Sequence, residues 1–312
     1  MVIQPPQRWI DGEGPDSDVV MSCRVRLARN VAGFPFANRA SETQRQEILT
    51  IAKQSLLQDD VAPNMIWVDL NQATALDRRL LFERHLISKH MVDAETKRGV
   101  AISGDETLSV MVNEEDHLRI QALAPGFQLR KVLERINAID DRVESRMDFA
   151  FSPKLGYLTA CPTNLGTGIR YSCMMHLPAL KLTEELTRVQ NAARDLHLAV
   201  RGYYGEGTES AGDFYQVSNQ ITLGRSEEDF LEEFEAQVVP KLIDYERFAR
   251  QQLIKTNSVM LDDRLNRAVG ILKNAHLIGV EEAMKLLSRV RLGIQIGRLE
   301  GITIQTINRL FL

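Results

Sequence analysis

The chain has 312 residues, of which 44% are hydrophobic and 26% are charged, a composition typical of a folded globular protein and not of a disordered one. Its 38 Lys and Arg residues against 42 Asp and Glu residues give a formal net charge of −4. This balance argues against a general binder of nucleic acids or membrane surfaces, because both need a basic surface.

The cysteines and the apolar runs indicate the compartment. Three cysteines without CxxC spacing argue against a disulfide framework or a zinc site and fit the reducing cytoplasm. No run of about 18 apolar residues predicts a membrane-spanning helix. Residues 1–10 contain prolines and no apolar core, so no signal peptide is expected. We therefore expect a cytoplasmic protein.

In chain order, the first predicted element is a half-buried strand over residues 19–27, where apolar and polar residues alternate. Arg24 and Arg26 project from its polar face. Two arginines fixed on one side of a strand are suited to bind an anion, because the guanidinium stays charged and offers a planar fork to phosphate oxygens.

The next predicted element is a helix that a capping box opens at Ser41 and Gln44 and that ends near Leu57. Further strands are expected over residues 65–70, 100–103, 108–112, 157–161 and 214–223, with one more from residue 200 onward. Further helices are expected over residues 75–91, 128–145 and 183–199, and after the cap at Ser226. Strand signals stop near residue 240, so residues 241–312 are expected to be all helical.

An acidic stretch follows the apolar run of residues 108–112. Its sequence is Asn113-Glu114-Glu115-Asp116-His117-Leu118-Arg119. Groups of both charges held this close indicate a substrate with both charges, or two substrates of opposite sign. If the chain stays extended, Glu115, His117 and Arg119 lie on one face. Taken by itself, the stretch could equally be a solvated turn.

Phosphate binding would need a different solution from the two most familiar ones. The chain has neither a GxxxxGK[ST] loop nor a GxGxxG loop followed by a kinase catalytic loop. A cage of arginines is the alternative, with candidates that each sit on the first strand or next to a turn or strand end: Arg24, Arg26, Arg119, Arg170 and Arg201. Their spacing alone is also compatible with ordinary surface salt bridges.

Four segments together resemble the catalytic domain of the phosphagen (ATP:guanido) kinases. They are Ser22-Cys23-Arg24-Val25-Arg26, residues 113–119, Cys161-Pro162-Thr163-Asn164-Leu165-Gly166-Thr167-Gly168-Ile169-Arg170, and Arg201-Gly202-Tyr203-Tyr204-Gly205-Glu206. Their order and spacing match over roughly residues 15–235. Within the family, the chain looks most like the bacterial protein arginine kinases.

The resemblance implies a fold of the α+β class. A phosphagen-kinase-like catalytic domain, with a central antiparallel sheet flanked by helices, is expected over residues 1–239. A small all-helical C-terminal domain is expected over residues 240–312. Only about 20 residues precede the first arginine motif, whereas phosphagen kinases carry a helical domain there that encloses a small substrate. An open site of this kind suits an arginine side chain on a protein.

The resemblance also implies roles for individual residues. The five arginines named above would bind the phosphates of ATP and the transferring phosphoryl group, and Arg119 and Arg170 would act in catalysis together with Glu115 and Glu206. The two glutamates would hold the substrate guanidinium. His85 would lie beside the adenine, and Cys161 would tune the site or touch the substrate. Mg²⁺ would bridge the phosphates, without a metal site built from side chains alone.

The implied function is transfer of the γ-phosphoryl group of ATP to arginine side chains in proteins. In the family this mark leads substrates to a Clp ATPase and protease, a zinc-binding protein activates the enzyme, and the enzyme can form a homodimer. Two alternatives remain open. The chain could phosphorylate free arginine or another small guanidino compound, or it could be a weakly active adaptor that recognises arginine-rich or phosphoarginine proteins.

Overall fold

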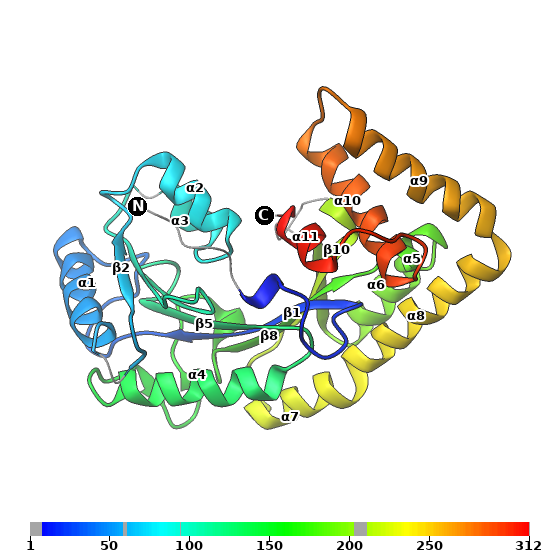
Figure 1. The fold of residues 1–312 in the computed structure, drawn as a ribbon. Helices are drawn as coiled ribbons and strands as arrows, with labels where there is room; N and C mark the ends of the chain where they lie inside the picture. Colours follow the sequence, from blue (N-terminus) through cyan, green and yellow to red (C-terminus); the bar gives the residue numbers. More distant parts are fainter. Residues whose placement is uncertain (1–7, 59–60, 94, 203–210, 312) are drawn as a thin grey trace.

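The computed structural model describes residues 8–58, 61–93, 95–202 and 211–311. Within them, an eight-stranded antiparallel sheet has the order β2-β3-β4-β5-β1-β8-β10-β9 (Figure 1). Its strands are β1 (Val20–Arg29), β2 (Ile66–Asp69), β3 (Gly99–Ile102), β4 (Leu108–Val112), β5 (Leu118–Pro125), β8 (Ile169–His176), β9 (Leu198–Gly202) and β10 (Phe214–Asn219). Two short strands, β6 (Phe151–Ser152) and β7 (Gly156–Tyr157), form a separate ribbon.

Helices surround this sheet and make up the C-terminal region. In chain order they are α1 (Glu42–Leu56), α2 (Ala75–Glu83), α3 (Lys89–Val92), α4 (Leu129–Glu144), α5 (Pro178–Leu182), α6 (Leu186–Asp195), α7 (Glu227–Glu233), α8 (Val239–Thr256), α9 (Ser258–Asn274), α10 (Val280–Gln295) and α11 (Ile304–Arg309). Short helical turns are η1 (Arg8–Ile10), η2 (Pro162–Asn164), η3 (Ala211–Asp213) and η4 (Phe234–Val238). No helix of the described residues is long and apolar enough to cross a bilayer. The expected α+β class is confirmed, as is the all-helical region after β10.

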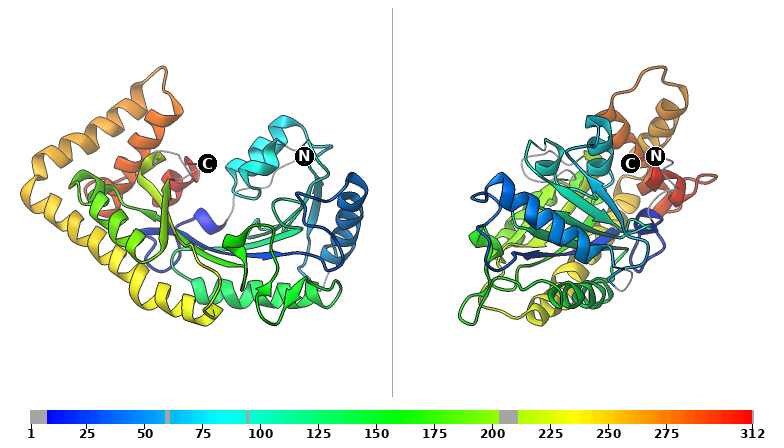
Figure 2. Two further views of the ribbon diagram at one scale, coloured as in Figure 1. Left: turned by 180° about the vertical axis from the view of Figure 1, so that it is seen from behind. Right: turned by 90° about the vertical axis from the view of Figure 1, so that its left-hand side faces the viewer.

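The two faces of the sheet have different neighbours. Helix α4 packs against β1 and β5 on one face, and its buried side chains recur at helical spacing, as at Leu129, Val132 and Ile136. Val25 and Leu27 of β1 are fully buried. On the other face, α2 and α3 rise at one end of the sheet and α10 and α11 at the other (Figures 1 and 2). Between these two groups of helices, a cleft lies over the second face.

One expected helix is interrupted where the backbone enters the left-handed region. The single helix expected over residues 75–91 is wrong: α2 ends at Glu83, and His85 has a φ of +58° before α3 begins. The backbone N–H of His85 donates to the carbonyl of Phe82, which closes the last turn of α2. As a result α3 starts in a new direction at Lys89.

Three other expected elements are shorter in the structure. The strand expected over residues 157–161 is limited to β7, the helix expected over 183–199 is α6 alone, and the strand expected over 214–223 ends at Asn219. For α6 the cause is visible in the backbone, because Glu184 and His197, on either side of it, have φ values of +62° and +54°.

The division after residue 239 stays a prediction. The segments α7, η4 and α8 follow one another directly from Glu227 to Thr256, so the backbone shows no linker there. The C-terminal helices also share an apolar cluster with the sheet and with η1, which consists of Trp9, Ile10, Met21, Leu123, Phe214, Ala268, Met284, Leu286, Leu287, Val290, Ile307 and Phe311.

A buried polar chain joins α10 to the sheet. The guanidinium of Arg291, which is fully buried, donates to Nδ1 of His176 on β8 at 2.7 Å. Burial, followed by the nearby Arg291, lowers the pKa of His176 well below its usual value, so the ring is neutral. Its Nε2 can then donate to Oγ of Ser288, 2.9 Å away, and Ser288 donates to Asp213 at 2.6 Å. Helix α10 is thereby tied to β8 and to η3, directly before β10.

Arg291 also holds the segment before β1. It donates to the backbone oxygens of Ser17 (2.7 Å) and Asp18 (3.2 Å) and to Oδ1 of Asn308 (3.0 Å). One buried side chain thus satisfies four acceptors from three separate parts of the chain. The oxygen of Asp18 also accepts from Arg250. The other three acceptors would lose this donor if the guanidinium were removed, and such a loss is costly inside a protein.

We expect Arg291→Ala to lower the free energy of unfolding by on the order of 3–5 kcal/mol, because buried acceptors lose their donor. Urea denaturation measures this value. Arg264→Ala is the matched control, since Arg264 is exposed on α9, and it should change stability by less than about 0.5 kcal/mol. Equal effects of the two substitutions would contradict this role of Arg291.

Candidate active site

The strand register places all five predicted arginines on one face of the sheet. Arg26 of β1 lies opposite Arg170 of β8, and Ala28 of β1 lies opposite Arg119 of β5. Directly opposed residues of an antiparallel pair project to the same side. Arg201 of β9 pairs with Gln216 of β10 and joins this face through the same rule. Arg24 and Gln216 also share it, since Arg24 donates to Gln216 Oε1 at 2.6 Å.

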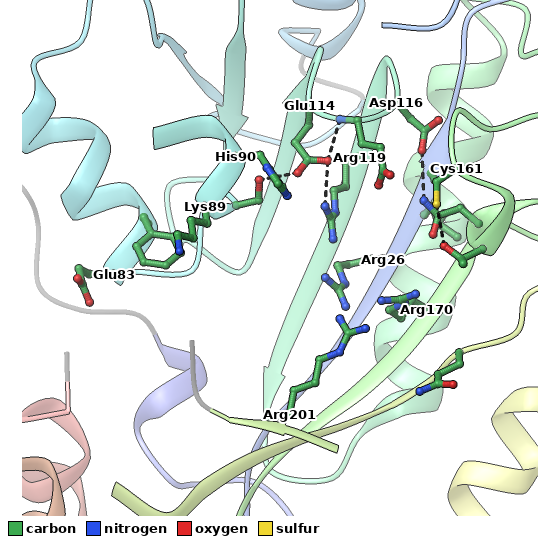
Figure 3. A pocket seen from close by; sticks show the side chains of 18 of the residues that line it. Arg26, Glu83, Lys89, His90, Glu114, Asp116, Arg119, Cys161, Arg170 and Arg201 are labelled. Carbon is green, nitrogen blue, oxygen red and sulfur yellow. Dashed lines mark hydrogen bonds and ion pairs between the residues drawn. The ribbon is translucent and has the colours of Figure 1, made fainter. Parts of the chain in front are cut away.

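Above this face lies a cleft of about 1600 Å³. Its floor carries Arg26, Arg119, Arg170 and Arg201, whose side chains converge in Figure 3. One wall comes from α2 and α3, with the charged or polar residues Arg79, Glu83, Ser88, Lys89 and His90. The opposite wall comes from α10 and the end of α11 and is apolar. The acidic turn, Glu114 to Asp116, and the Gly-rich turn close the remaining side.

The floor is strongly positive. Burial, and then the charges of Arg24, Arg119, Arg170 and Arg201, hold the pKa of Arg26 well below its usual range. Nε and Nη2 of Arg26 are buried and have no hydrogen-bond partner among the described residues. Buried donors of this kind call for an acceptor from outside the chain. A polyphosphate fits this floor, because it brings several anionic oxygens to the same spot.

Glu114 is the carboxylate that the described structure pairs with this cluster. Its Oε2 accepts from Arg119 at 2.9 Å, and its Oε1 accepts from Ser88 of α3 at 2.6 Å. Burial by itself would raise the pKa of Glu114, but Arg119 and the hydrogen bonds outweigh it and lower the pKa to about 2. Glu114 is therefore ionised at neutral pH and fixes Arg119 against α3.

The acidic stretch is a turn, so the expectation of a continuous extended chain is wrong. Asn113 has a φ of +59°, and β5 starts only at Leu118. Glu115 is exposed at the cleft. His117 is buried and turned away, with Nδ1 accepting from the backbone of Val31 at 3.0 Å. Of the three residues expected on one face, Glu115 and Arg119 line the cleft and His117 does not.

Asp116 connects this turn to the two neighbouring segments. Its Oδ1 accepts from Asn30 Nδ2 and from the backbone N–H of Ala160, both at 2.7 Å. Asn30 directly follows β1, and Ala160 precedes the Gly-rich turn. The buried carboxylate of Asp116 thus sets the position of Glu115 relative to Cys161, which also lines the cleft.

The Gly-rich turn contacts the backbone of its neighbours closely. A Cβ at Gly168, which has a φ of +66°, would lie 2.7 Å from the carbonyl oxygen of Ala28. A Cβ at Gly166, which has a φ of +106°, would lie 2.4 Å from the carbonyl oxygen of Thr222. Only glycine fits such positions. The turn is consequently pressed against β1, and Arg170 emerges from it at the start of β8.

Arg24 and His85 lie beside the cleft and not in it. They line a separate small cavity, which also includes Trp9 and Gln216. The rings of Trp9 and His85 meet edge to face with centroids 5.6 Å apart. Burial, and then Arg24, lower the pKa of His85 to about 3, so its ring is neutral. Glu206, the second predicted glutamate, lies outside the described residues.

Comparisons with known proteins agree with this geometry. Residues 47–249 match the ATP:guanido phosphotransferase C-terminal catalytic domain. The chain belongs to the ATP:guanido phosphotransferase family. Residues 258–312 match the protein-arginine kinase McsB C-terminal domain. The predicted resemblance is thereby confirmed, and the chain is a phosphotransferase.

Individual members of the ATP:guanido phosphotransferase family cover most of the chain. The protein-arginine kinase of Bacillus pumilus is 45% identical over 98% of this chain and 84% of its own length. The protein-arginine kinase of Symbiobacterium thermophilum is 45% identical over 99% of this chain and 88% of its own length. Among solved structures, a taurocyamine kinase from Schistosoma mansoni superposes with a TM-score of 0.67 at 31% identity, covering 78% of this chain and 36% of that one. A lombricine kinase superposes with a TM-score of 0.64 at 28% identity, covering 78% of this chain and 71% of that one.

Some residues of this ATP:guanido phosphotransferase site were not singled out by the sequence. Glu114 was one of three successive carboxylates, and nothing local separates the buried one from the exposed one. Ser88, which fixes Glu114, is remote in sequence and carries no motif. The apolar wall of α10 was visible only as helical periodicity, which does not say what the helix packs against.

The pairing of Glu114 gives a pH dependence that can be measured. A pKa lowered from 4.5 to about 2 contributes about 3 kcal/mol of stability. This contribution is complete above about pH 5 and is lost as the pH falls toward 2. In urea denaturation at pH 7, the free energy of unfolding of the wild type should exceed that of Glu114→Gln by about this amount. The difference between the two should shrink between pH 5 and 3.

The control for Glu114 is Glu47→Gln, on the exposed side of α1. It should leave the free energy of unfolding unchanged within about 0.5 kcal/mol. A gap between the wild type and Glu114→Gln that stays constant from pH 7 to pH 3 would rule out the ion pair with Arg119 as its source.

Because the arginines on the cleft floor repel one another, removing one of them should stabilise the fold and weaken phosphate binding. Arg26→Met should raise the free energy of unfolding by about 1–3 kcal/mol, since a buried, crowded charge is replaced by an apolar chain of similar length. The same change should abolish the stabilisation that inorganic triphosphate gives the wild type. Thermal denaturation with and without triphosphate tests both, with Arg264→Met as the exposed control. A less stable Arg26→Met that triphosphate still protects would refute this assignment.

Proposed function

We propose that the cleft transfers the γ-phosphoryl group of Mg-ATP to the guanidinium of arginine side chains in proteins. The observation that carries this proposal is one cleft with four guanidiniums on its floor and the carboxylate of Glu115 at its edge. Further support comes from relatives named protein-arginine kinase that match 97–99% of the chain.

The arginines supply what phosphoryl transfer needs. The reaction depends mainly on positioning and on neutralising the phosphoryl oxygens, with little covalent work for the protein. In the proposal, Arg26, Arg119, Arg170 and Arg201 bind the phosphates, and Arg24 supports them from the adjoining cavity. Mg²⁺ bound together with ATP would neutralise part of the phosphate charge. His85 beside the adenine stays a prediction, since its ring lies in the cavity shared with Trp9.

Carboxylates are needed because a guanidinium is a poor nucleophile. Its pKa lies above about 12, so it carries a proton and a positive charge at neutral pH. In the proposal, Glu115 fixes the planar group, orients one nitrogen toward the γ-phosphorus and accepts the proton that is released. Glu206 is proposed as the second carboxylate. Because Glu115 is exposed while Glu114 and Asp116 are buried, it is the one carboxylate of the turn suited to meet a substrate.

A second candidate is a kinase for a free guanidino compound. It is favoured by the fold likeness to kinases named for taurocyamine and lombricine. The C-terminal match to the protein-arginine kinase domain favours the protein substrate. The two candidates share one phosphate site, so only the choice of acceptor separates them.

The wider setting is part of the same proposal. We infer that the modified proteins pass to a Clp ATPase and protease, that a zinc-binding protein activates the enzyme, and that the enzyme forms a homodimer.

Cytoplasmic action is supported by the cysteines. Cys23 and Cys173 face each other across β1 and β8 and are both free thiols, which fits a reducing compartment.

The proposal is tested by incubating the protein with Mg-ATP and either casein or free arginine. Products are read by mass spectrometry without acid, since the P–N bond is acid-labile. Phosphoarginine on casein is expected. Glu115→Gln should lower the rate by on the order of 10²-fold or more, and Arg170→Ala by about 10²–10³-fold. Glu47→Gln and Arg264→Ala serve as matched controls and should keep the full rate.

The outcomes separate the candidates. Phosphorylation of free arginine alone would favour the small-molecule kinase. Absence of product from both acceptors, with binding of arginine-rich protein retained, would favour the adaptor.

A further inference from the structure

The cleft is larger than its phosphate chemistry requires. Pockets that bind a small ligand usually measure about 300–1000 Å³, whereas this cleft measures about 1600 Å³. Part of its lining is the wall opposite α2 and α3. We call this wall the C-terminal apolar wall and define it by Val280, Ala283, Met284, Leu287, Leu310 and Phe311.

The wall has a rigid base and an exposed rim. Met284, Leu287 and Phe311 are buried and belong to the cluster that packs α10 against the sheet. Val280 is 75% exposed and Leu310 is 58% exposed, and both line the cleft. Exposed apolar side chains backed by a fixed core are the usual makeup of a surface that binds another apolar group.

We propose that the C-terminal apolar wall binds apolar side chains next to the target arginine in an unfolded segment of a protein substrate. This inference rests on the proposed function and adds the substrate class. The wall is continuous with the cleft that holds Glu115, so a chain whose arginine reaches Glu115 has its neighbouring residues inside the same cavity. Apolar residues beside an arginine are accessible in unfolded segments and are mostly buried in folded proteins.

The asymmetry of the cleft supports this choice of occupant. Apart from Phe82, the α2 and α3 wall is charged or polar, with Arg79, Glu83 and Lys89, while the opposite wall offers carbon atoms. A free guanidino compound has no group to fill the apolar side. A polypeptide does, since its side chains alternate in direction at about 3.3 Å per residue when extended.

The test compares two fluorescent peptides that differ only beside the arginine, one with leucines and one with serines. The substituted enzyme carries Val280→Ser with Leu310→Ser. Both sites are exposed, and Val280 is the first residue of α10, where serine is well tolerated. The matched control carries Val259→Ser with Leu196→Ser. Val259 lies at the start of α9 and is 83% exposed, and Leu196 directly follows α6 and is 56% exposed.

Peptide binding is read by fluorescence anisotropy and phosphorylation by mass spectrometry. The wild type and the control should bind and phosphorylate the leucine peptide about 10-fold better than the serine peptide. The Val280→Ser, Leu310→Ser enzyme should lose most of this preference while its rate with the serine peptide stays unchanged. A wild type without preference, or a substituted enzyme that keeps it, would overturn the inference.

Two further outcomes would assign the wall to another occupant and overturn the inference as well. Weaker binding of Mg-ADP in the substituted enzyme would assign the wall to the nucleotide. A change in mass by sedimentation would assign it to a second copy of the chain. By contrast, preferential binding of the leucine peptide without any phosphorylation would support the wall as a docking surface and count against the proposed function alone.

Discussion

The rest of the structure depends on holding several guanidiniums together on one face of a sheet. Arg26 faces Arg170 across β1 and β8. Arg119 stands on β5, next to β1, and Arg201 stands on β9, beyond β10. Like charges at this spacing repel, and burial adds a desolvation cost. The opposite face offsets this cost, because it packs Val25 and Leu27 against α4. The sheet thus places its stabilising contacts on one side and its reactive groups on the other.

The turns around the cluster share a design in which a buried carboxylate orders an exposed group. Glu114 fixes Arg119, and Asp116 connects the ends of β1 and of the segment before Cys161. Glu115, between the two, is the carboxylate left facing the cleft. Buried polar groups also fix a whole helix. The chain of hydrogen bonds through Arg291 and His176 holds α10, and with it the apolar wall, against the sheet.

The sequence allowed those features to be predicted whose cause is local. Alternation over residues 19–27 gave β1 and the common face of Arg24 and Arg26, and the capping box at Ser41 gave the start of α1. Left-handed residues were missed, among them Asn113 and His85. Asn113 is fixed by bonds to the carbonyls of Arg45 and Lys97, and His85 lies against Trp9, contacts from remote parts of the chain that no window around either residue contains. Asparagine does tolerate this conformation, so Asn113 carried a weak signal.

The position of β1 has a consequence for how this chain can change. It is paired on both sides, with β5 and with β8, and its side chains alternate between the apolar core and the arginine floor. Its pairing with β8 is irregular between Val20 and Ser22 and regular afterwards. Inserting one residue just after Ser22 would turn every later side chain to the opposite face, moving Arg26 into the core and Val25 into the cleft. Length variation is thus forbidden in this strand, whereas the exposed loop over residues 275–279 between α9 and α10 can absorb it.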